Sequence, residues 1–140
     1  MMNIHATAIC IDGRAVLLMG PSGCGKSDLA IRLIDDGATL IADDRTDLRR
    51  DGNLLVAGAP KEIAGMIELR GIGLLRVDYV DGIPVELIAE LTPPAERLPQ
   101  QRFRDFLGVA VPVIRMSAFE PSSTARIRLA LRNSLIEVAE

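Results

Sequence analysis

The sequence predicts an α/β domain with a mixed β-sheet and a C-terminal helix. A glycine-rich loop, residues 20–27, lies between an apolar run typical of a strand and a stretch with helical periodicity. The middle of the chain consists of short apolar runs separated by Asp-Gly dipeptides, which favour tight turns because glycine accepts positive φ. The last segment, residues 122–138, repeats apolar residues at helical spacing. Strands, a crossover helix and a terminal helix are therefore expected in one α/β unit.

The chain has 140 residues, of which 49% are hydrophobic. A chain of this size and composition fits one folded domain spanning residues 1–140. Its 16 basic and 19 acidic residues give a net charge of -3 and are scattered along the chain, so no nucleic-acid partner is expected. No signal-type or membrane-length apolar run occurs, which favours a cytoplasmic protein with no membrane association.

The N-terminal elements follow from the apolar pattern and its breaks. Residues 4–19 are expected to form two strands around an Asp12-Gly13 hairpin turn, and the second strand leads into the glycine loop. A helix is expected from about Ser27 to Gly37, because glycine can take the left-handed conformation that ends a helix. The run TLIADD, residues 39–44, then predicts a short buried strand with two carboxylates at its end.

The remaining elements are less regular. Asp51-Gly52 and Asp81-Gly82 predict two further hairpin turns. Three prolines within residues 91–99 predict a surface loop, because proline cannot complete a helix interior or a central strand. Residues 109–119 favour one more strand. A terminal helix is expected from Ser122 or Ser123, both candidate N-caps, to Val138.

The glycine loop carries the most specific signal in the chain. It matches the Walker A pattern G-x-x-x-x-G-K-[ST] and follows a predicted strand and precedes a predicted helix. Its residues, all assigned to nucleotide binding, are Gly20, Pro21, Ser22, Gly23, Cys24, Gly25, Lys26 and Ser27. Converging backbone N–H groups and the helix N-terminus suit phosphate, Lys26 can neutralise phosphate oxygens, and Ser27 can ligate Mg²⁺. The loop predicts binding of a nucleoside polyphosphate.

Two aspartates, Asp43 and Asp44, follow the strand beyond the first helix, where a Walker B carboxylate for Mg²⁺ is expected. Transfer to a hydroxyl can use a second carboxylate as proton acceptor, so the pair is interpreted as one metal ligand and one acid/base group. The alternative is a polar strand end without chemistry. His5, judged without further context, is an ordinary strand histidine.

The two cysteines, Cys10 and Cys24, lack the CxxC spacing of a metal or redox motif, so reduced thiols are expected. Cys24 lies inside the glycine loop, where helix-terminal N–H groups favour a reactive thiolate. A small side chain at a tolerant position is the preferred interpretation of Cys24.

Four segments in order, IHATAI, GPSGCGKSD, LIADD and IELRGIGLLRV, resemble the catalytic domain of HPr kinase/phosphorylase, a bacterial enzyme acting on a serine of the phosphocarrier protein HPr. The resemblance covers residues 5–77. It implies a P-loop nucleotide fold similar to that of phosphoenolpyruvate carboxykinase, with ATP and Mg²⁺ as cofactors. The implied function is an ATP-dependent serine kinase that regulates a bacterial phosphotransferase system.

The resemblance also implies roles for individual residues. Lys26 and Ser27 would hold ATP and Mg²⁺, with Asp44 as a further metal ligand. Asp43 would be the acid/base group facing the target serine. The other implied site residues are His5, near the transferred phosphate, and Glu68 and Arg70, in the family signature beside the phosphates. Without the resemblance, Glu68 and Arg70 are interpreted as a cross-strand ion pair on an exposed face.

After Val77 the agreement fades, and no residue is carried over from that region. The resemblance implies a short form without the separate N-terminal domain of longer members, and a homo-oligomer, since family members are hexamers. Phosphorylase activity stays open. Arg115, Arg126 and Arg128 are candidates for supplying transition-state charge, the alternative being that arginines on a terminal helix are solvated surface residues.

Two other functions stay open at this point. One is a small-molecule kinase, for which a lid carrying Arg97, Arg102 and Arg104 is the candidate. The other is an ATP-binding regulator without transfer activity. A signalling GTPase is not expected, because neither lysine, Lys26 or Lys61, lies in an N-K-x-D motif.

Overall fold

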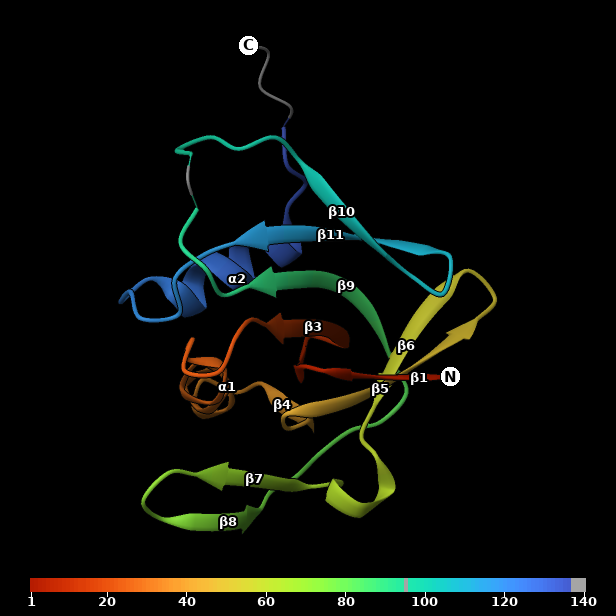
Figure 1. The fold of residues 1–140 in the computed structure, drawn as a ribbon, viewed down its shortest axis with the longest axis vertical. Coiled ribbons are helices and arrows are strands. Elements are labelled where there is room, and N and C mark those ends of the chain that lie inside the picture. The colour runs from red at the N-terminus through yellow and green to blue at the C-terminus, as the bar shows by residue number, and fades with distance from the viewer. Residues whose placement is uncertain (95, 137–140) are drawn as a thin grey trace.

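The computed structural model describes residues 1–94 and 96–136, which form a mixed β-sheet with helices beside it and a small separate hairpin (Figure 1). In chain order the elements are β1 (Met2–His5), β2 (Thr7–Ile11), β3 (Arg14–Met19), α1 (Lys26–Asp35), β4 (Thr39–Ala42), β5 (Arg45–Asp51), β6 (Leu54–Gly58), the 3₁₀ turn η1 (Lys61–Ile63), β7 (Met66–Leu69), β8 (Gly73–Arg76), β9 (Ile83–Glu90), β10 (Arg102–Phe106), β11 (Val109–Arg115) and α2 (Ser123–Arg132). The predicted α/β class with a mixed sheet and a C-terminal helix is confirmed.

The main sheet has the order β1-β5-β6-β9-β3-β2-β4, and β11 also pairs with β9 and carries β10 at its outer edge. Strand β9 runs parallel to both β3 and β11, while β2 runs antiparallel to both β3 and β4. It follows that β3, β4, β9 and β11 end at the same edge of the sheet. Figure 1 shows the arrowheads of β3, β9 and β11 pointing the same way, toward α1.

The core lies on both faces of this sheet. On one face, Leu29 and Leu33 of α1 pack with Val16 and Leu18 of β3, and α2 adds Ile127 to the same cluster. The other face is covered by apolar side chains from β1, β5 and β6. Its members include Ile4, Leu17, Leu48, Leu55 and Ile88. Burial on both faces accounts for the nearly continuous apolar sequence of β3.

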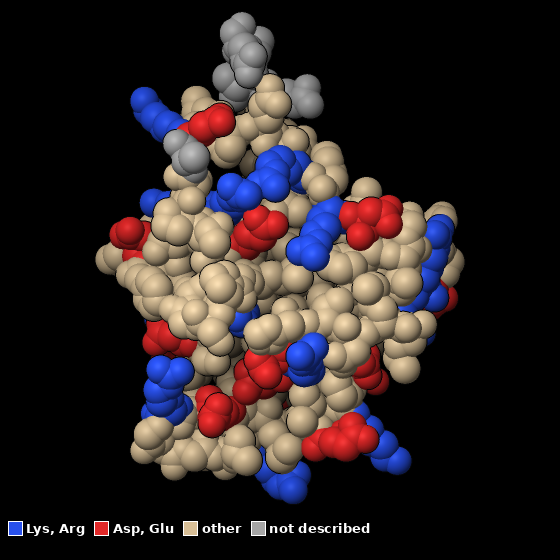
Figure 2. Space-filling model, in the orientation of Figure 1, with Lys and Arg blue, Asp and Glu red and all other residues tan. Residues whose placement is uncertain are grey.

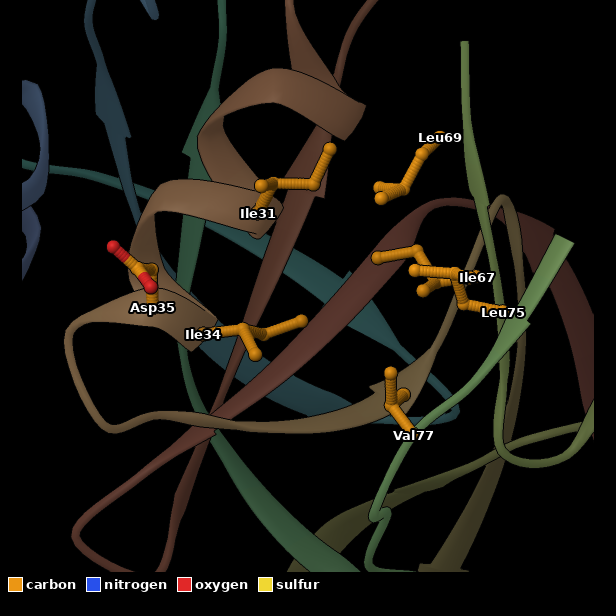
Figure 3. Close-up of a pocket in the computed structure, with 7 residues that line it drawn as sticks. All are labelled: Ile31, Ile34, Asp35, Ile67, Leu69, Leu75 and Val77. Atoms are coloured by element: carbon orange, nitrogen blue, oxygen red, sulfur yellow. The ribbon is translucent and has the colours of Figure 1, made fainter. Parts of the chain in front are cut away.

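The hairpin of β7 and β8 is a two-stranded sheet apart from the main one. Some of its apolar side chains face α1 across a hollow of about 170 Å³ (Figure 3). The lining residues are Ile31, Ile34 and Asp35 of α1 and Ile67, Leu69, Leu75 and Val77 of the hairpin segment. Ile67 is almost fully buried, so this contact fixes the hairpin against the helix that follows the glycine loop.

Most of the predicted local elements are confirmed. The Asp12-Gly13 turn joins β2 to β3, and the Asp51-Gly52 turn joins β5 to β6. Helix α1 begins at Lys26 and is followed by Gly37 with φ of 103°, the left-handed conformation expected of a terminating glycine. The described part of residues 91–99 contains no helix or strand, and β11 lies within the predicted range of 109–119.

Two predictions about strands were wrong or incomplete, and one strand was missed. Residues 4–19 form parts of three strands, because the chain changes partners at Ala6: β1 pairs with β5, and β2 pairs with β3 and β4. Asp81-Gly82 does not close a hairpin; Gly82 donates its N–H to the carbonyl of Ala57, and the turn leads from β8, which pairs with β7, into β9. Strand β10 was not predicted.

Local composition explains why β10 was missed. Four of its five residues are exposed and three are charged, as suits an edge strand protected from pairing with other chains. The turn to β11 uses Leu107 and Gly108, both with positive φ, instead of an Asp-Gly dipeptide.

Helix α2 is shorter than predicted. It begins at Ser123, with Ser122 as the residue before it, and ends at Arg132 because Asn133 has extended backbone angles. Leu135 lies beyond the helix and is exposed, and Val138 lies outside the described residues.

Acidic and basic side chains are interspersed over the strands on the face shown in Figure 2.

None of the helices in the described part of the chain has the length and apolar character needed to cross a membrane.

Substitution of Leu33 by Ala tests the packing of α1 on the sheet. Leu33 is fully buried, so Leu33→Ala is expected to lower the free energy of unfolding by about 2–5 kcal/mol, measured by urea denaturation. The control is Leu129→Ala on α2, whose side chain is exposed and whose loss should change stability by less than about 0.5 kcal/mol. Equal effects would contradict the packing described.

Candidate active site

The glycine loop connects the end of β3 to the start of α1 at the shared edge of the sheet. Gly25 has φ of 96°, and a Cβ there would lie 2.8 Å from the Cβ of Ala118 and 2.9 Å from ring carbons of Phe119. Any other residue would therefore be both strained and crowded. Leu29 donates its N–H to the carbonyl of Gly25, so the helix begins directly at the loop and its first N–H groups face the loop region.

Lys26 is buried at the base of the loop. Its Nζ donates to the carbonyl of Gly20 at 2.7 Å and to that of Pro21 at 3.4 Å, so the ammonium group is held inside the loop. Cys24 Sγ lies 3.8 Å from the same nitrogen. Ser27 follows in the first turn of α1 and is exposed. A phosphate held by the loop would meet a cation, a hydroxyl and backbone N–H groups.

Asp43 is the half-buried member of the aspartate pair that follows β4. Its Oδ2 accepts the backbone N–H of Glu68 at 3.1 Å, while its Oδ1 is buried and has no hydrogen-bond partner among the described residues. Burial raises the pKa of the Asp43 carboxyl above its usual value, and the charges of Asp44 and Glu68 raise it further. Two groups lower the pKa of Asp43 and so oppose this shift: the Glu68 N–H, through its hydrogen bond, and the side chain of Thr7. A carboxyl whose pKa is raised toward neutral pH is suited to accept and donate a proton.

Asp44 has a different environment. Its backbone is left-handed, with φ of 67°, and its N–H donates to Thr7 Oγ1 at 3.0 Å, which holds this conformation. Its exposed carboxylate lies with Oδ1 2.8 Å from His5 Nε2. When Nε2 carries a proton, His5 donates to Oδ1 of Asp44, which leaves Oδ2 of Asp44 for another ligand.

Strand pairing brings the loop and the aspartates together. Ala8 of β2 is paired with Leu17 on one side and with Ala42 on the other. The residue before it, Thr7, therefore lies between the end of β3, which leads to the loop, and the end of β4, which leads to Asp43. Neighbouring strands are about 4.8 Å apart, so the glycine loop after β3 and the aspartate pair after β4 lie close enough to form one site.

Glu68 and Arg70 lie on the β7–β8 hairpin. Glu68 reaches the site through its backbone N–H, while its side chain is exposed. Arg70 lies in the exposed turn between the strands. The cross-strand partner of Glu68 is Leu74, so the alternative of a cross-strand ion pair between Glu68 and Arg70 was wrong.

The candidate arginines divide into two groups. Arg126 donates to the hydroxyl of Ser122, and Arg128 pairs with Asp36 at the end of α1, so both already have partners at or between the two helices. Arg115 ends β11 and pairs with Glu90 at 3.1 Å, at the same edge as the loop. Arg102 and Arg104 belong to β10, which is paired with β11 along its length, so neither lies on a lid.

Two residues of the site were not identified from the sequence. Thr7 looks like an ordinary strand residue, yet its buried hydroxyl holds the backbone of Asp44. Phe119 looks like part of an apolar strand end, yet its ring lies against the glycine loop. Neither belongs to a local motif, and both gain their position only from pairing between distant segments.

The oxygen groups present fit Mg²⁺. This ion prefers oxygen ligands and takes one or two carboxylates, completing its coordination with phosphate oxygens and water. Ser27 Oγ and the carboxylate oxygen of Asp44 that does not contact His5 are oxygens of this kind. The ion would supply neutralisation of phosphate charge.

A Walker A loop on a mixed sheet, followed by an aspartate pair at the same edge, defines a P-loop nucleotide-binding protein. The family model described as HPr Serine kinase C-terminal domain matches residues 1–128. The chain therefore belongs to the HPr serine kinase C-terminal domain family, whose fold is the phosphoenolpyruvate-carboxykinase-like P-loop fold expected from the sequence.

Individual relatives agree with this assignment. The chain is 46% identical over 128 residues to an HPr kinase/phosphorylase of Lactobacillus acidophilus, covering 81% of this chain and 40% of that protein. It is 30% identical to one of Cupriavidus necator, covering 98% and 47%. The structure of the Hpr(Ser) kinase/phosphatase of Coxiella burnetii matches with a TM-score of 0.82 at 30% identity, covering 94% of this chain and 89% of that one. The chain spans less than half the length of these two curated relatives.

The raised pKa of Asp43 predicts a pH-dependent cost to stability. The folded protein binds the Asp43 proton more tightly than the unfolded chain, so stability falls as pH rises from the unfolded value near 3.8 through the folded pKa. Asp43→Asn keeps an oxygen for the Glu68 N–H and removes the charge. It is expected to be more stable than wild type at pH 7, with the gain shrinking toward pH 4, measured by urea denaturation.

The control is Asp51→Asn, which removes the same charge from an exposed turn. It should show no comparable gain at pH 7. A gain of Asp43→Asn that is equal at both pH values would contradict the raised pKa of Asp43.

Proposed function

We propose that this chain is the ATP-binding catalytic domain of a serine kinase that phosphorylates an HPr-type phosphocarrier protein and so regulates a bacterial phosphotransferase system. The observation that carries the proposal is the environment of Asp43. Its carboxyl is half-buried, has a raised pKa and keeps one oxygen without a partner among the described residues. It lies at the sheet edge where β3 ends and the Walker A loop begins. Relatives named HPr kinase/phosphorylase support the choice of substrate.

The reaction assigns each residue a task. The serine Oγ of the carrier forms a bond to the γ-phosphorus of ATP, the bond between that phosphorus and the bridging oxygen breaks, and ADP leaves. The hydroxyl proton passes to Asp43. Lys26 and the loop N–H groups bind the phosphates, while Ser27 and Asp44 are the proposed ligands of Mg²⁺. His5 orients Asp44 through the 2.8 Å contact.

The same carboxyl suits a dephosphorylation reaction, in which an oxygen of inorganic phosphate attacks the phosphorus of the phosphoserine, the bond from that phosphorus to the serine Oγ breaks, and pyrophosphate and serine are released. There the leaving serine oxygen needs a proton, and a carboxyl with a raised pKa holds one over a wider pH range. The names of the relatives, phosphorylase and phosphatase, support including this second activity in the proposal.

The test is incubation of the protein with Mg²⁺-ATP and HPr-type proteins, with phosphoserine detected by mass spectrometry. Phosphorylation should be lost when the target serine of the carrier is replaced by Ala, and also in Lys26→Ala, which removes the phosphate-binding cation. Transfer to a metabolite instead of any carrier would favour a small-molecule kinase, and ATP binding without any transfer would favour a regulator.

Substitutions of the two aspartates are expected to reduce the rate of transfer in different ways. Asp43→Asn should bind Mg²⁺-ATP nearly normally and lose about 10²–10⁴-fold in rate, because a proton acceptor is absent. Asp44→Asn should bind Mg²⁺ more weakly, and added Mg²⁺ or Mn²⁺ should restore part of its rate, since excess ion can offset a lost ligand. Steady-state kinetics across metal concentrations measures both.

Rescue of Asp43→Asn by metal, with none for Asp44→Asn, would exchange the two roles. Near-normal transfer by both variants would contradict the kinase mechanism. The matched control is Asp47→Asn, a carboxylate on β5 whose side chain accepts a hydrogen bond from Asn3, away from the loop.

We include in the proposal a single domain, a homo-oligomeric assembly such as the hexamer of the family, and a cytoplasmic location, where ATP and phosphocarrier proteins are found. The family model over residues 1–128 supports the single domain; the assembly and the location follow from the resemblance to HPr kinase/phosphorylase.

A further inference from the structure

Phe119 is an exposed aromatic ring beside the glycine loop. It lies in the segment between β11 and α2, residues 116–122, and its ring carbons come within 2.9 Å of where a Cβ of Gly25 would be. The side chain nevertheless remains 65% exposed. One part of the ring therefore contacts the loop backbone while much of it is open to solvent, in a chain with only three phenylalanines, one tyrosine and no tryptophan.

The ring is held in place by its own segment. The guanidinium of Arg32, on α1, donates to the carbonyl of Ala118. The hydroxyl of Ser123 donates to the carbonyl of Ser117 at 2.8 Å, and the N–H of Phe119 itself donates to Ser117 Oγ at 3.2 Å. After Phe119, the N–H of Glu120 donates to Ser123 Oγ at 3.1 Å, so backbone atoms are anchored on both sides of Phe119. An exposed ring on an anchored backbone loses little freedom when a flat ligand covers it.

The two aspartates and the segment that carries Phe119 lie on opposite sides of β3. Asp43 and Asp44 lie on the β2–β4 side of β3, whereas residues 116–122 follow β11, which lies on the other side of β3 beyond β9. A nucleoside triphosphate bound with its γ-phosphate toward the aspartates directs its base away from them. Phe119 lies on that other side, next to the start of α1.

We infer that Phe119 is a stacking platform for the purine base of the bound nucleotide. The inference rests on the proposed binding of a nucleoside triphosphate by residues 20–27, and it adds the base to the phosphates as a recognised part of the ligand. Aromatic side chains stack on purines through their flat faces, and this interaction needs no hydrogen bond to the base edge.

The experiment compares two probes by titration calorimetry: Mg²⁺-ATP, and inorganic tripolyphosphate with Mg²⁺, which has the phosphates without a base. Phe119→Ala is expected to weaken ATP binding about 5- to 150-fold, the range measured for loss of one base–aromatic stack. The affinity of Phe119→Ala for tripolyphosphate should equal that of wild type. Phe119→Tyr keeps the ring and should bind ATP as wild type does.

The matched control is Phe103→Ala. Phe103 is also an exposed phenylalanine, but it lies on the edge strand β10, which is separated from β3 by β9 and β11. Its loss should change neither affinity. Equal weakening of both probes in Phe119→Ala would assign Phe119 a structural role in the loop, and unchanged ATP affinity would exclude contact with the base; either result overturns the inference. Failure of wild type to bind either probe would overturn nucleotide binding itself.

A second measurement does not depend on removing the ring. Because the chain has no tryptophan, Phe119→Trp carries a single tryptophan, whose emission reports on this position. Its emission should change with Mg²⁺-ATP and not with tripolyphosphate, and the emission of Phe103→Trp should change with neither. An emission of Phe119→Trp that responds equally to both probes, or to neither, contradicts base stacking.

Discussion

Strand β2 is antiparallel to β3 on one side and to β4 on the other, and the site depends on this double pairing. Because Ala8 is paired with both Leu17 and Ala42, the ends of β3 and β4 are held at one edge of the sheet. The glycine loop and the aspartate pair are separated by about one helix in the sequence, yet they become neighbours across a single strand. Thr7 occupies the position between them, and its hydroxyl fixes the backbone of Asp44.

Unequal burial then gives two adjacent carboxylates different chemistry. Asp43 is half-buried, accepts a backbone N–H from Glu68 and retains one buried oxygen without a partner in the described part of the chain. Asp44 is exposed and contacts His5. Desolvation raises the pKa of the buried carboxyl, whereas an exposed carboxylate remains available to a cation.

The helix α1 connects this edge to the outer parts of the site. On one side its Ile31 and Ile34 face the β7–β8 hairpin, which positions Glu68 beside Asp43 (Figure 3). On the other side its Arg32 anchors the segment that carries Phe119. Gly25 at the start of the helix allows Ala118 and Phe119 to approach the loop, so the same glycine serves both the loop conformation and the packing of a distant segment.

The sequence by itself determined the glycine loop, helix α1, the turns at Asp12-Gly13 and Asp51-Gly52, and the place of two aspartates after a buried strand. Each depends on residues adjacent in the chain, whose backbone preferences and spacing are local. Tertiary structure alone decided which aspartate is buried, why the chain changes partners at Ala6, why Asp81-Gly82 does not close a hairpin, and where Thr7, Phe119 and the exposed strand β10 lie. The physical reason is that burial, pKa and strand partners depend on contacts between residues far apart in the sequence, which no local pattern contains.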